Sequence, residues 1–320
     1  MSKIPQKSAK ALSSTMMKPG TPELAWQSLW GLSIGDAFGE TFFGKETVIV
    51  ERIAEKTLQD GEWLFTDDTV QGIGVFRTLS ACGVIDQDFL AKELAHNYLL
   101  DDYRGYGGTA HSIMKNIAAG SPWQTVSQSV FDGMGSAGNG AAMRSGPIGA
   151  WFAGDPATVV AQARLAAEVT HAHPEAIAGA IAVALGACCC AEARANRTAL
   201  TSSVFFDFII HHLPESDIKY KIRKAATLPV SYDIRTVVSI LGNGKLLTAA
   251  DTVPFALWCA AHHLTHYENA LWTAVSGLGD RDTIAAITGS IVVLYAGDDT
   301  IPAEWMTRAE KVDTSVFYKK

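Results

Sequence analysis

The sequence has little of what marks several large classes of protein. Charged residues make up only 18% of the 320 residues and the formal net charge is −7, so we expect no broad basic surface that binds nucleic acid. We see no run of eighteen or more apolar residues able to cross a membrane, and the first twenty residues lack the apolar core of a secretory signal. These absences predict a cytoplasmic protein with neither a membrane nor a nucleic acid among its partners.

Cysteine is also scarce, and its five copies do not suggest disulfide bonds. Cys188, Cys189 and Cys190 are adjacent in an alanine-rich stretch, and Cys82 and Cys259 lie far from them in sequence. Neighbouring cysteines on a helix cannot form an ordinary set of bridges, and an odd total leaves one unpaired. We therefore expect reduced thiols, and we interpret the triple cysteine as small apolar helix residues rather than a metal or redox site.

Patterns typical of β-strands are nearly absent. Only residues 48–50 form a β-branched run that could be extended, whereas apolar residues recur at helical spacing over most of the chain after Thr21. The clearest helix is expected over residues 174–194, because Pro174 suits a first helical turn. Further helices are expected after His111, after Asp155, and over residues 89–100, 204–213, 234–241, 253–263 and 283–295.

The glycines fall mostly between the predicted helices, and no Pro- or Ser-rich linker divides the chain. We therefore predict an all-α fold with a single compact domain over residues 21–320. Residues 1–20 carry several lysines among serines and are expected to form a mobile, basic N-terminal extension.

Two acidic clusters lie near opposite ends of this domain. Residues 66–69 read Thr-Asp-Asp-Thr and residues 280–283 read Asp-Arg-Asp-Thr, and each cluster immediately precedes a helical apolar repeat. Asp and Thr are common helix caps, so either cluster alone could be only a cap. If the two helix starts meet, their oxygen atoms form the all-oxygen site that a hard divalent cation requires.

Glycine-rich segments supply a second set of candidates. Residues 105–108 and 138–142 could turn backbone N–H groups toward an anion without obstruction by side chains, or could simply be tight turns between helices. The histidine groups at residues 211–212 and 262–266 have some of the spacing of a zinc site. They lack an accompanying Glu at the required position, so we interpret them as surface or core residues.

Taken in order, these motifs resemble the ADP-ribosylglycohydrolase family, which includes the dinitrogenase-reductase-activating glycohydrolases. The matching segments are Gly35-Asp36-Ala37-Phe38-Gly39, Phe65-Thr66-Asp67-Asp68-Thr69, Arg104-Gly105-Tyr106-Gly107, Gly138-Asn139-Gly140-Ala141-Ala142-Met143-Arg144, Thr170-His171, Gly242-Asn243-Gly244 and Gly279-Asp280-Arg281-Asp282-Thr283. The resemblance covers residues 26–305. It implies a single orthogonal helical bundle with a binuclear metal centre that holds two Mg²⁺ ions, or Mn²⁺ in some members.

The resemblance also implies roles for individual residues. The implied metal ligands are Thr66, Asp67, Asp68, Asp280, Asp282 and Thr283. Asp68 and Asp282 are our candidates for polarising water or protonating the leaving group. The residues assigned to substrate binding are Asp36, Gly105, Tyr106, Gly107, Gly138, Asn139, Gly140, Ala141, Ala142, Met143, Arg144, His171, Gly242 and Asn243. For Arg144, a contact with phosphate and a supporting role behind the site both remain open.

Three positions depart from the family pattern. Phe43 stands where many members carry a Glu seven residues after Asp36, and Glu40 and Glu46 are its nearest acidic neighbours in sequence. Leu278 replaces a usual Gly, and Arg281 replaces a small residue between two expected ligands. These departures leave open a less active member, or a regulator that binds nucleotide without turnover.

The function that the resemblance implies is metal-dependent hydrolysis of the bond between ADP-ribose and a modified protein side chain. We expect arginine as the acceptor; serine, O-acetyl-ADP-ribose and nucleic-acid adducts are alternatives. A second hypothesis is an immunity protein that neutralises an ADP-ribosyltransferase toxin through residues 1–20, with or without hydrolase activity. The expected partners are therefore an ADP-ribosylated protein or ADP-ribose, and such a toxin under the second hypothesis.

Overall fold

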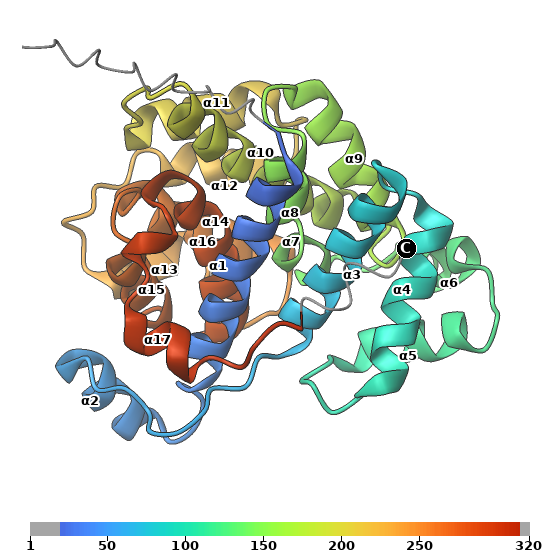
Figure 1. The fold of residues 1–320 in the computed structure, drawn as a ribbon, viewed down its shortest axis with the longest axis horizontal. Helices are drawn as coiled ribbons and strands as arrows, with labels where there is room; N and C mark the ends of the chain where they lie inside the picture. The colour runs from blue at the N-terminus through green and yellow to red at the C-terminus, as the bar shows by residue number, and fades with distance from the viewer. Residues whose placement is uncertain (1–19, 314–320) are drawn as a thin grey trace, which may run out of the picture.

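A computed structural model describes residues 20–313 of the protein. No β-strand occurs among these residues, and their only bridge pairs are Trp63 with Ala309 and Gly138 with Thr248. The predicted all-α fold is confirmed (Figure 1). Apart from Gly20, the predicted N-terminal extension lies outside the described residues.

The helices vary in length from single turns to long core helices (Figure 1). In chain order they are α1 (Pro22–Glu40), α2 (Glu46–Glu55), α3 (Asp67–Cys82), α4 (Gln87–Leu100), α5 (Gly108–Ala118), α6 (Trp123–Ser129), α7 (Gly140–Met143), α8 (Gly146–Trp151), α9 (Pro156–Glu168), α10 (Pro174–Ala195), α11 (Ser202–His212), α12 (Asp217–Ala225), α13 (Ile234–Leu241), α14 (Ala249–His262), α15 (Tyr267–Val275), α16 (Arg281–Ala296), the 3₁₀ helix η1 (Asp298–Thr300) and α17 (Ala303–Arg308).

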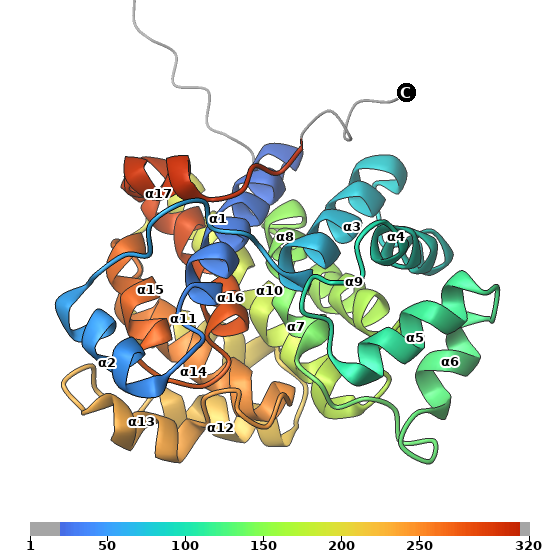
Figure 2. The same cartoon turned by 90° about the horizontal axis from the view of Figure 1, so that it is seen from below.

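Helices α1 and α16 lie side by side in the middle of the molecule (Figures 1 and 2). Gly31, Gly35 and Gly39 repeat every four residues and so lie on one face of α1. A Cβ atom on Gly35 would come within 2.3 Å of the Ala285 carbonyl oxygen, and one on Gly39 within 2.4 Å of the Arg281 carbonyl oxygen. The glycines therefore let the two backbones touch, and this contact places the C-terminal half of α1 beside the start of α16.

Helix α10 forms much of the core. Its alanines as far as Ala193 and the free thiols of Cys188, Cys189 and Cys190 are buried, as expected for small apolar residues. The helix begins with Pro174 in its first turn, after His173, whose ring accepts a hydrogen bond from the Glu175 N–H. By length and composition α10 could cross a membrane, which our sequence analysis did not recognise, but 94% of its apolar window is buried inside the protein. It is packed as a core helix.

The prediction of an extended segment at residues 48–50 is wrong, because these residues lie within α2. Ile49 and Ile53 are four residues apart and turn toward the core on the same side of the helix. Arg52 fixes this helix to the end of α1 by donating to the Thr41 carbonyl oxygen at 2.7 Å. A short β-branched run forms a strand only when another strand pairs with it, and no strand lies within residues 20–313.

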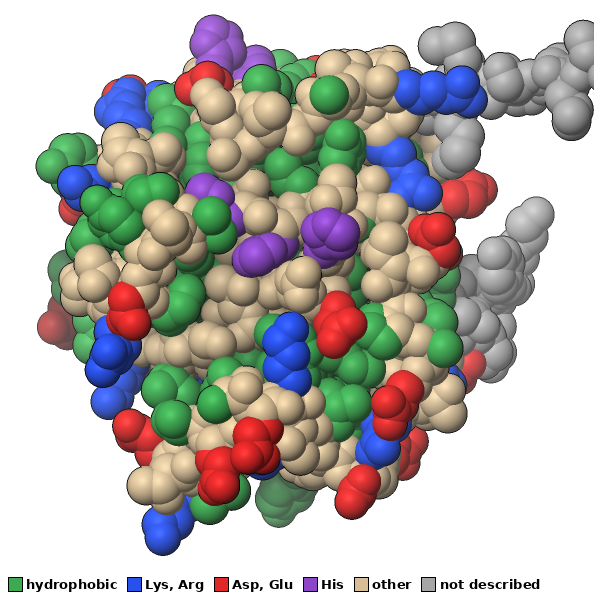
Figure 3. Space-filling model, turned by 90° about the vertical axis from the view of Figure 1, so that its left-hand side faces the viewer, with side chains coloured by type: hydrophobic (Ala, Val, Ile, Leu, Met, Phe, Trp, Pro, Cys, Tyr) green, Lys and Arg blue, Asp and Glu red, His purple; other side chains and the backbone are tan. Residues whose placement is uncertain are grey.

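Histidine side chains are visible at more than one place on the face shown in Figure 3. Those of the predicted surface or core groups have local partners: His262 Nε2 lies 3.1 Å from the Leu228 carbonyl oxygen, and His263 Nε2 lies 3.0 Å from Thr273 Oγ1. No group of metal-binding side chains among residues 20–313 includes these histidines. Their arrangement fits the interpretation as surface and core residues.

The contact between α1 and α16 gives a first testable prediction. Gly35→Ala places a methyl group against backbone atoms, which cannot move aside as a side chain can, so we expect a loss of about 3 kcal/mol in the free energy of unfolding. Gly108→Ala is the matched control, because a Cβ atom there meets nothing within 4 Å. Urea denaturation of both variants measures the difference. Equal stability of the two variants would contradict the close contact.

Candidate metal centre and ligand cavity

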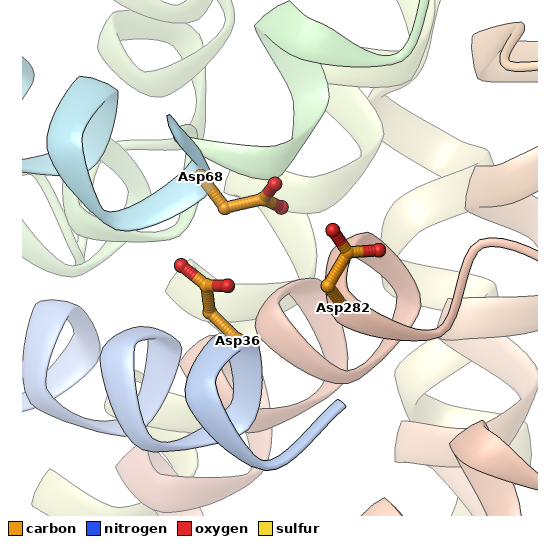
Figure 4. A group of neighbouring side chains, drawn as sticks. All are labelled: Asp36, Asp68 and Asp282. Atoms are coloured by element: carbon orange, nitrogen blue, oxygen red, sulfur yellow. The ribbon is translucent and has the colours of Figure 1, made fainter. Parts of the chain in front are cut away.

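Three aspartates from three different helices point toward one another at the centre of the site (Figure 4). Asp36 comes from α1, Asp68 from the first turn of α3 and Asp282 from the first turn of α16. Each offers a carboxylate oxygen, and these oxygen atoms lie within 4.8 Å of one another. Both acidic clusters of the sequence therefore meet, and Asp36 joins them from beneath.

Several hydrogen bonds fix the carboxylate of Asp36 in place. It is fully buried, and it accepts hydrogen bonds from the backbone N–H and hydroxyl of both Thr66 and Thr69, at distances of 2.6 to 3.1 Å. These donors fix the start of α3 onto the end of α1. We assigned Asp36 to substrate binding, but the structure places it below the ligand cavity rather than along its wall.

The two helix starts are also bonded directly to each other. Thr283 Oγ1 at the start of α16 donates to Asp68 Oδ2 at the start of α3, at 3.3 Å. Asp280 occupies the cap position of α16 but makes no capping hydrogen bond to that helix. Its Oδ2 instead accepts a hydrogen bond of 2.6 Å from Asn139 Nδ2. For Asp280, the interpretation as a simple helix cap is therefore excluded.

Burial and mutual repulsion disfavour the charged forms of these carboxylates. Burial, followed by the charge of Asp282, raises the pKa of Asp36 to about 7 and that of Asp67 to about 8. The pKa values of Asp68, Asp280 and Asp282 are raised as well, again chiefly by burial. Among residues 20–313, no Lys, Arg or His forms an ion pair with any of these aspartates. The charge of Arg281 lowers the pKa of Asp282, but burial outweighs this effect, and the cluster remains without an ion-paired cation in this part of the chain.

The donor atoms fit a hard divalent cation. Asp68 Oδ1 and Asp282 Oδ1 are buried without a hydrogen-bond partner, which is costly for a carboxylate unless a cation binds there. The surrounding ligand atoms are carboxylate and hydroxyl oxygens, with no thiol or imidazole in the group. Such a set suits Mg²⁺ or Mn²⁺ rather than Zn²⁺.

A cavity of about 500 Å³ opens beside this cluster. Its walls include the predicted metal ligands Asp67, Asp68, Asp280, Asp282 and Thr283, and the predicted substrate residues Gly105, Gly107, Gly138, Asn139, Gly140, Met143 and His171. The other predicted residues, which do not line it, are Asp36, Thr66, Tyr106, Ala141, Ala142, Arg144, Gly242 and Asn243. The cavity therefore joins an acidic end to an end built from glycine backbone and a histidine.

The predicted glycine segments have different positions. A Cβ atom on Gly140 would come within 2.9 Å of the His171 ring, so glycine is needed where the 138–140 loop passes this side chain. The segment around Gly242 supports the metal end from outside: the Asn243 carbonyl oxygen accepts from the Asp280 N–H at 2.9 Å. Gly244 is in the left-handed region, and a Cβ atom there would meet the Asp280 side chain at 2.4 Å.

The three departures from the family pattern lie together near the start of α16, and none of them lines the cavity. The Arg281 guanidinium stacks over the Phe43 ring at 5.1 Å and donates to the Leu278 carbonyl oxygen at 3.1 Å. It forms no ion pair with the aspartates beside it, although the charges of Asp282 and Asp280 act on it. Leu278 has a φ of 54°, a conformation that favours glycine. Partial burial and then the charge of Asp282 raise the pKa of Glu40 to about 7, which places this carboxyl near the cluster.

Sequence reasoning missed three polar residues that support the site. Gln71 bonds Asp67 from one helical turn away, at 2.8 Å, and its i+4 spacing on α3 was a signal that could have revealed it. Thr252 accepts a hydrogen bond from Asn139, and Thr170 contacts His171. No spacing in the sequence indicated the contact between Asn139 and Thr252, which lie 113 residues apart. Thr170 is adjacent to His171 and stood in the predicted Thr170-His171 segment, but without a role of its own.

The fold and the site together define a class, namely all-α proteins in which an acidic cation site opens into a ligand cavity. Comparison with known families makes the assignment specific. The model of the ADP-ribosylglycohydrolase family matches residues 17–317, and this chain belongs to that family. The predicted family resemblance is thereby confirmed.

Relatives of known sequence agree in length with this chain. ADP-ribosylhydrolase ARH3 of Xenopus tropicalis is 28% identical over 322 residues, covering 88% of this chain and 90% of its own. The ADP-ribosyl-[dinitrogen reductase] glycohydrolase of Rhodospirillum rubrum is 26% identical over 320 residues, covering 94% and 95%. A solved structure titled ADP-ribosylglycohydrolase-related protein complex shares the fold, with a TM-score of 0.61 and 23% identity over 90% of this chain and 93% of that one.

The raised pKa values predict how the stability of the metal-free protein depends on pH. The folded aspartates hold protons up to about pH 7 or 8, whereas unfolded aspartates release them near pH 4. Between these limits the folded state binds more protons, so stability falls as pH rises, by about 2 kcal/mol or more between pH 5 and pH 8. Denaturation in EDTA at both pH values measures this, and Mg²⁺ should restore stability at pH 8. A stability in EDTA that rises with pH would contradict the prediction.

Neutralising a single metal-ligand carboxylate should stabilise the metal-free protein but weaken its binding of metal. Asp68→Asn removes one of the repelling charges, so we expect the variant to be more stable than wild type in EDTA at pH 8, by about 1 kcal/mol. It should also lose most of the stabilisation by Mg²⁺, because a ligand is gone. Thermal unfolding with and without Mg²⁺ measures both effects. Asp60→Asn, at a fully exposed site, is the control and should change neither.

Proposed function

We propose that this protein is a metal-dependent hydrolase that removes ADP-ribose from modified protein side chains. The observation that carries the proposal is one cavity with two chemically different ends: a cluster of buried aspartates with unpartnered oxygens, and a glycine loop beside a histidine. ADP-ribose has a matching polarity, with ribose hydroxyls at one end and an anionic diphosphate nearer the middle. Membership of the ADP-ribosylglycohydrolase family supports the same substrate class.

At the acidic end, we propose that Thr66, Asp67, Asp68, Asp280, Asp282 and Thr283 hold two Mg²⁺ ions, with Mn²⁺ as a substitute. When bound, such a pair of ions grips vicinal ribose hydroxyls and lowers the pKa of a bound water. Asp68 and Asp282 each present an unpartnered Oδ1, and we assign these carboxylates to accepting and returning the proton during hydrolysis. The transition state at the anomeric carbon carries positive charge, which nearby carboxylates stabilise.

At the other end, the 138–140 loop and His171 are suited to bind the diphosphate. Glycines allow a phosphate oxygen to approach backbone N–H groups closely, because no side chain stands in the way. His171 lines the cavity beside this loop. The positions of these groups relative to the acidic end would fix the distal ribose over the metal site.

We propose arginine as the acceptor. A substituted guanidinium is a cation, which the acidic cluster and the nearby Glu40 would attract, while Arg281 packs over the Phe43 ring. The relative from Rhodospirillum rubrum is named for a protein substrate, dinitrogen reductase, which supports a protein acceptor here. The free thiols of the described cysteines suit a reducing compartment, and we place the reaction in the cytoplasm.

The test is release of free ADP-ribose from an arginine-ADP-ribosylated protein, with Mg²⁺ and with EDTA. We expect release only with the metal. A serine-ADP-ribosylated protein and O-acetyl-ADP-ribose are assayed in parallel. They show whether the protein hydrolyses such bonds at all, independently of whether arginine is the acceptor. Release from either of these but not from modified arginine would overturn the acceptor assignment. No metal-dependent release from any of them would overturn the hydrolase.

The proton-handling role of Asp282 gives a further prediction. Asp282→Asn keeps the size of the side chain but removes its basicity and charge, so we expect hydrolysis to fall by at least about a hundredfold. Saturating Mg²⁺ distinguishes this loss from weaker metal binding, and the exposed Asp60→Asn variant should retain wild-type activity. Activity of Asp282→Asn within a few fold of wild type would contradict the assignment.

A further inference from the structure

A chain of hydrogen-bonded side chains runs from Asp67 to His171; its middle member, Arg144, lies behind the cavity wall, which the other members line. It starts at Asp67, whose Oδ2 accepts from Gln71 Nε2 at 2.8 Å. Gln71 Oε1 in turn accepts from Arg144 Nη1 at 2.5 Å. Arg144 Nη2 donates to Thr170 Oγ1 at 2.8 Å, and that hydroxyl lies 2.7 Å from His171 Nδ1. Arg144 is completely buried and does not line the cavity, so it cannot be a direct ligand of the substrate in this structure.

The chemistry of the Thr170 hydroxyl decides where the histidine proton lies. A hydroxyl has one hydrogen to donate and two lone pairs to accept with. A guanidinium only donates, so the bond from Arg144 occupies one lone pair of Thr170. The Thr170 hydrogen then needs an acceptor, and the only one bonded to it among residues 20–313 is His171 Nδ1.

The opposite arrangement leaves a buried group unsatisfied. If Nδ1 carried the proton and donated to Thr170, that hydroxyl would accept twice and its own hydrogen would have no partner. Thr170 is 1% exposed, so this hydrogen could not bond to solvent. An unsatisfied buried donor is strongly disfavoured. The doubly protonated ring is disfavoured too, because burial and then the charge of Arg144 lower the pKa of His171 to about 3.

We propose that Arg144 is a positioning residue that, through Thr170, holds His171 as a neutral ring with its proton on Nε2, as a hydrogen-bond donor toward the cavity. Nε2 lies on the side of the 138–140 loop: a Cβ atom on Gly138 would be 3.2 Å from it, and one on Gly140 3.1 Å. No side chain or backbone group among the described residues is bonded to Nε2. The ring therefore presents its free N–H to whatever binds beside the loop.

The ligand for this donor must offer an acceptor oxygen. In this tautomer Nε2 attracts an anionic oxygen, whereas the other tautomer would present a lone pair and repel it. We assign the ligand as a phosphate oxygen of the ADP-ribose diphosphate. This assignment of the ligand rests on the proposed function, while the assignment of the proton rests on the hydrogen bonds among Arg144, Thr170 and His171.

The tautomer is tested by NMR correlation of the ring nitrogens and protons in the full chain, with His171→Gln used to identify the signals. We expect Nε2 to be protonated and Nδ1 to be bare in the wild type. Thr170→Val keeps the shape of the side chain but removes the hydroxyl, and should produce a mixture of tautomers; Thr170→Ser should restore the wild-type spectrum. A proton on Nδ1 in the wild type, or an unchanged spectrum in Thr170→Val, would overturn the proposal.

Thr170 is the better target than Arg144, because Arg144 is buried and its loss could prevent folding. After Thr170→Val, Arg144 Nη2 keeps its bond of 3.0 Å to the Ala166 carbonyl oxygen. Thr78→Val is the matched control for a buried threonine: its hydroxyl bonds only the Gly74 carbonyl oxygen within α3. The spectrum of His171 should be the same in Thr78→Val as in wild type.

Binding of ADP-ribose, measured by calorimetry, tests the ligand. We expect about tenfold weaker binding for Thr170→Val, the loss expected for one charge-assisted hydrogen bond, and recovery to within about twofold for Thr170→Ser. In a His171→Ala background, Thr170→Val should have no further effect, because its influence acts through the ring. An equal loss in that background would overturn the positioning role. Wild-type protein that shows the expected tautomer but does not bind ADP-ribose would overturn the proposed function alone.

Discussion

The backbone contact between α1 and α16 is the constraint on which the site depends. Gly35 and Gly39 bring α1 against the start of α16, and this contact fixes Asp36 beside Asp282. The Asp36 carboxylate is also restrained against turning away, because it accepts hydrogen bonds from Thr66 and Thr69. Burial raises the pKa of both carboxyls, and the charge of Asp282 raises that of Asp36 further. Packing of the surrounding core holds together a cluster of charges that would separate in isolation.

The two ends of the cavity are suited to ligands of opposite charge, a cation at one end and an anion at the other. The acidic end collects negative charge without an ion-paired cation among residues 20–313, which suits a divalent metal. The other end must accept an anion, and it does so with neutral groups, the backbone of the 138–140 loop and His171. Arg144 lies buried between the two ends, where burial lowers its pKa to about 10 and leaves it charged at neutral pH. It is linked to Asp67 by hydrogen bonds through Gln71, and its charge disfavours a charged His171.

Local patterns predicted the helices well where one face is apolar and the ends are marked. Helix α13 was expected with its observed bounds, and α10 differs by one residue at its end. The failures have physical causes. Residues 48–50 suit a strand by side-chain type, but pairing decides strands and no partner exists in the described part of the chain. Short helices such as α7 lie within glycine-rich segments, where periodicity cannot develop.

By itself, the sequence determined that acidic and hydroxyl side chains stand at the starts of α3 and α16, and that glycines leave the 138–140 loop open. These are local properties, set by neighbours within a few residues. The tertiary structure decided the rest: that the two starts meet over Asp36, and that Arg144 lies behind the cavity rather than within it. Helical spacing fixes which face a residue occupies, but only the packing of helices distant in sequence fixes which faces meet.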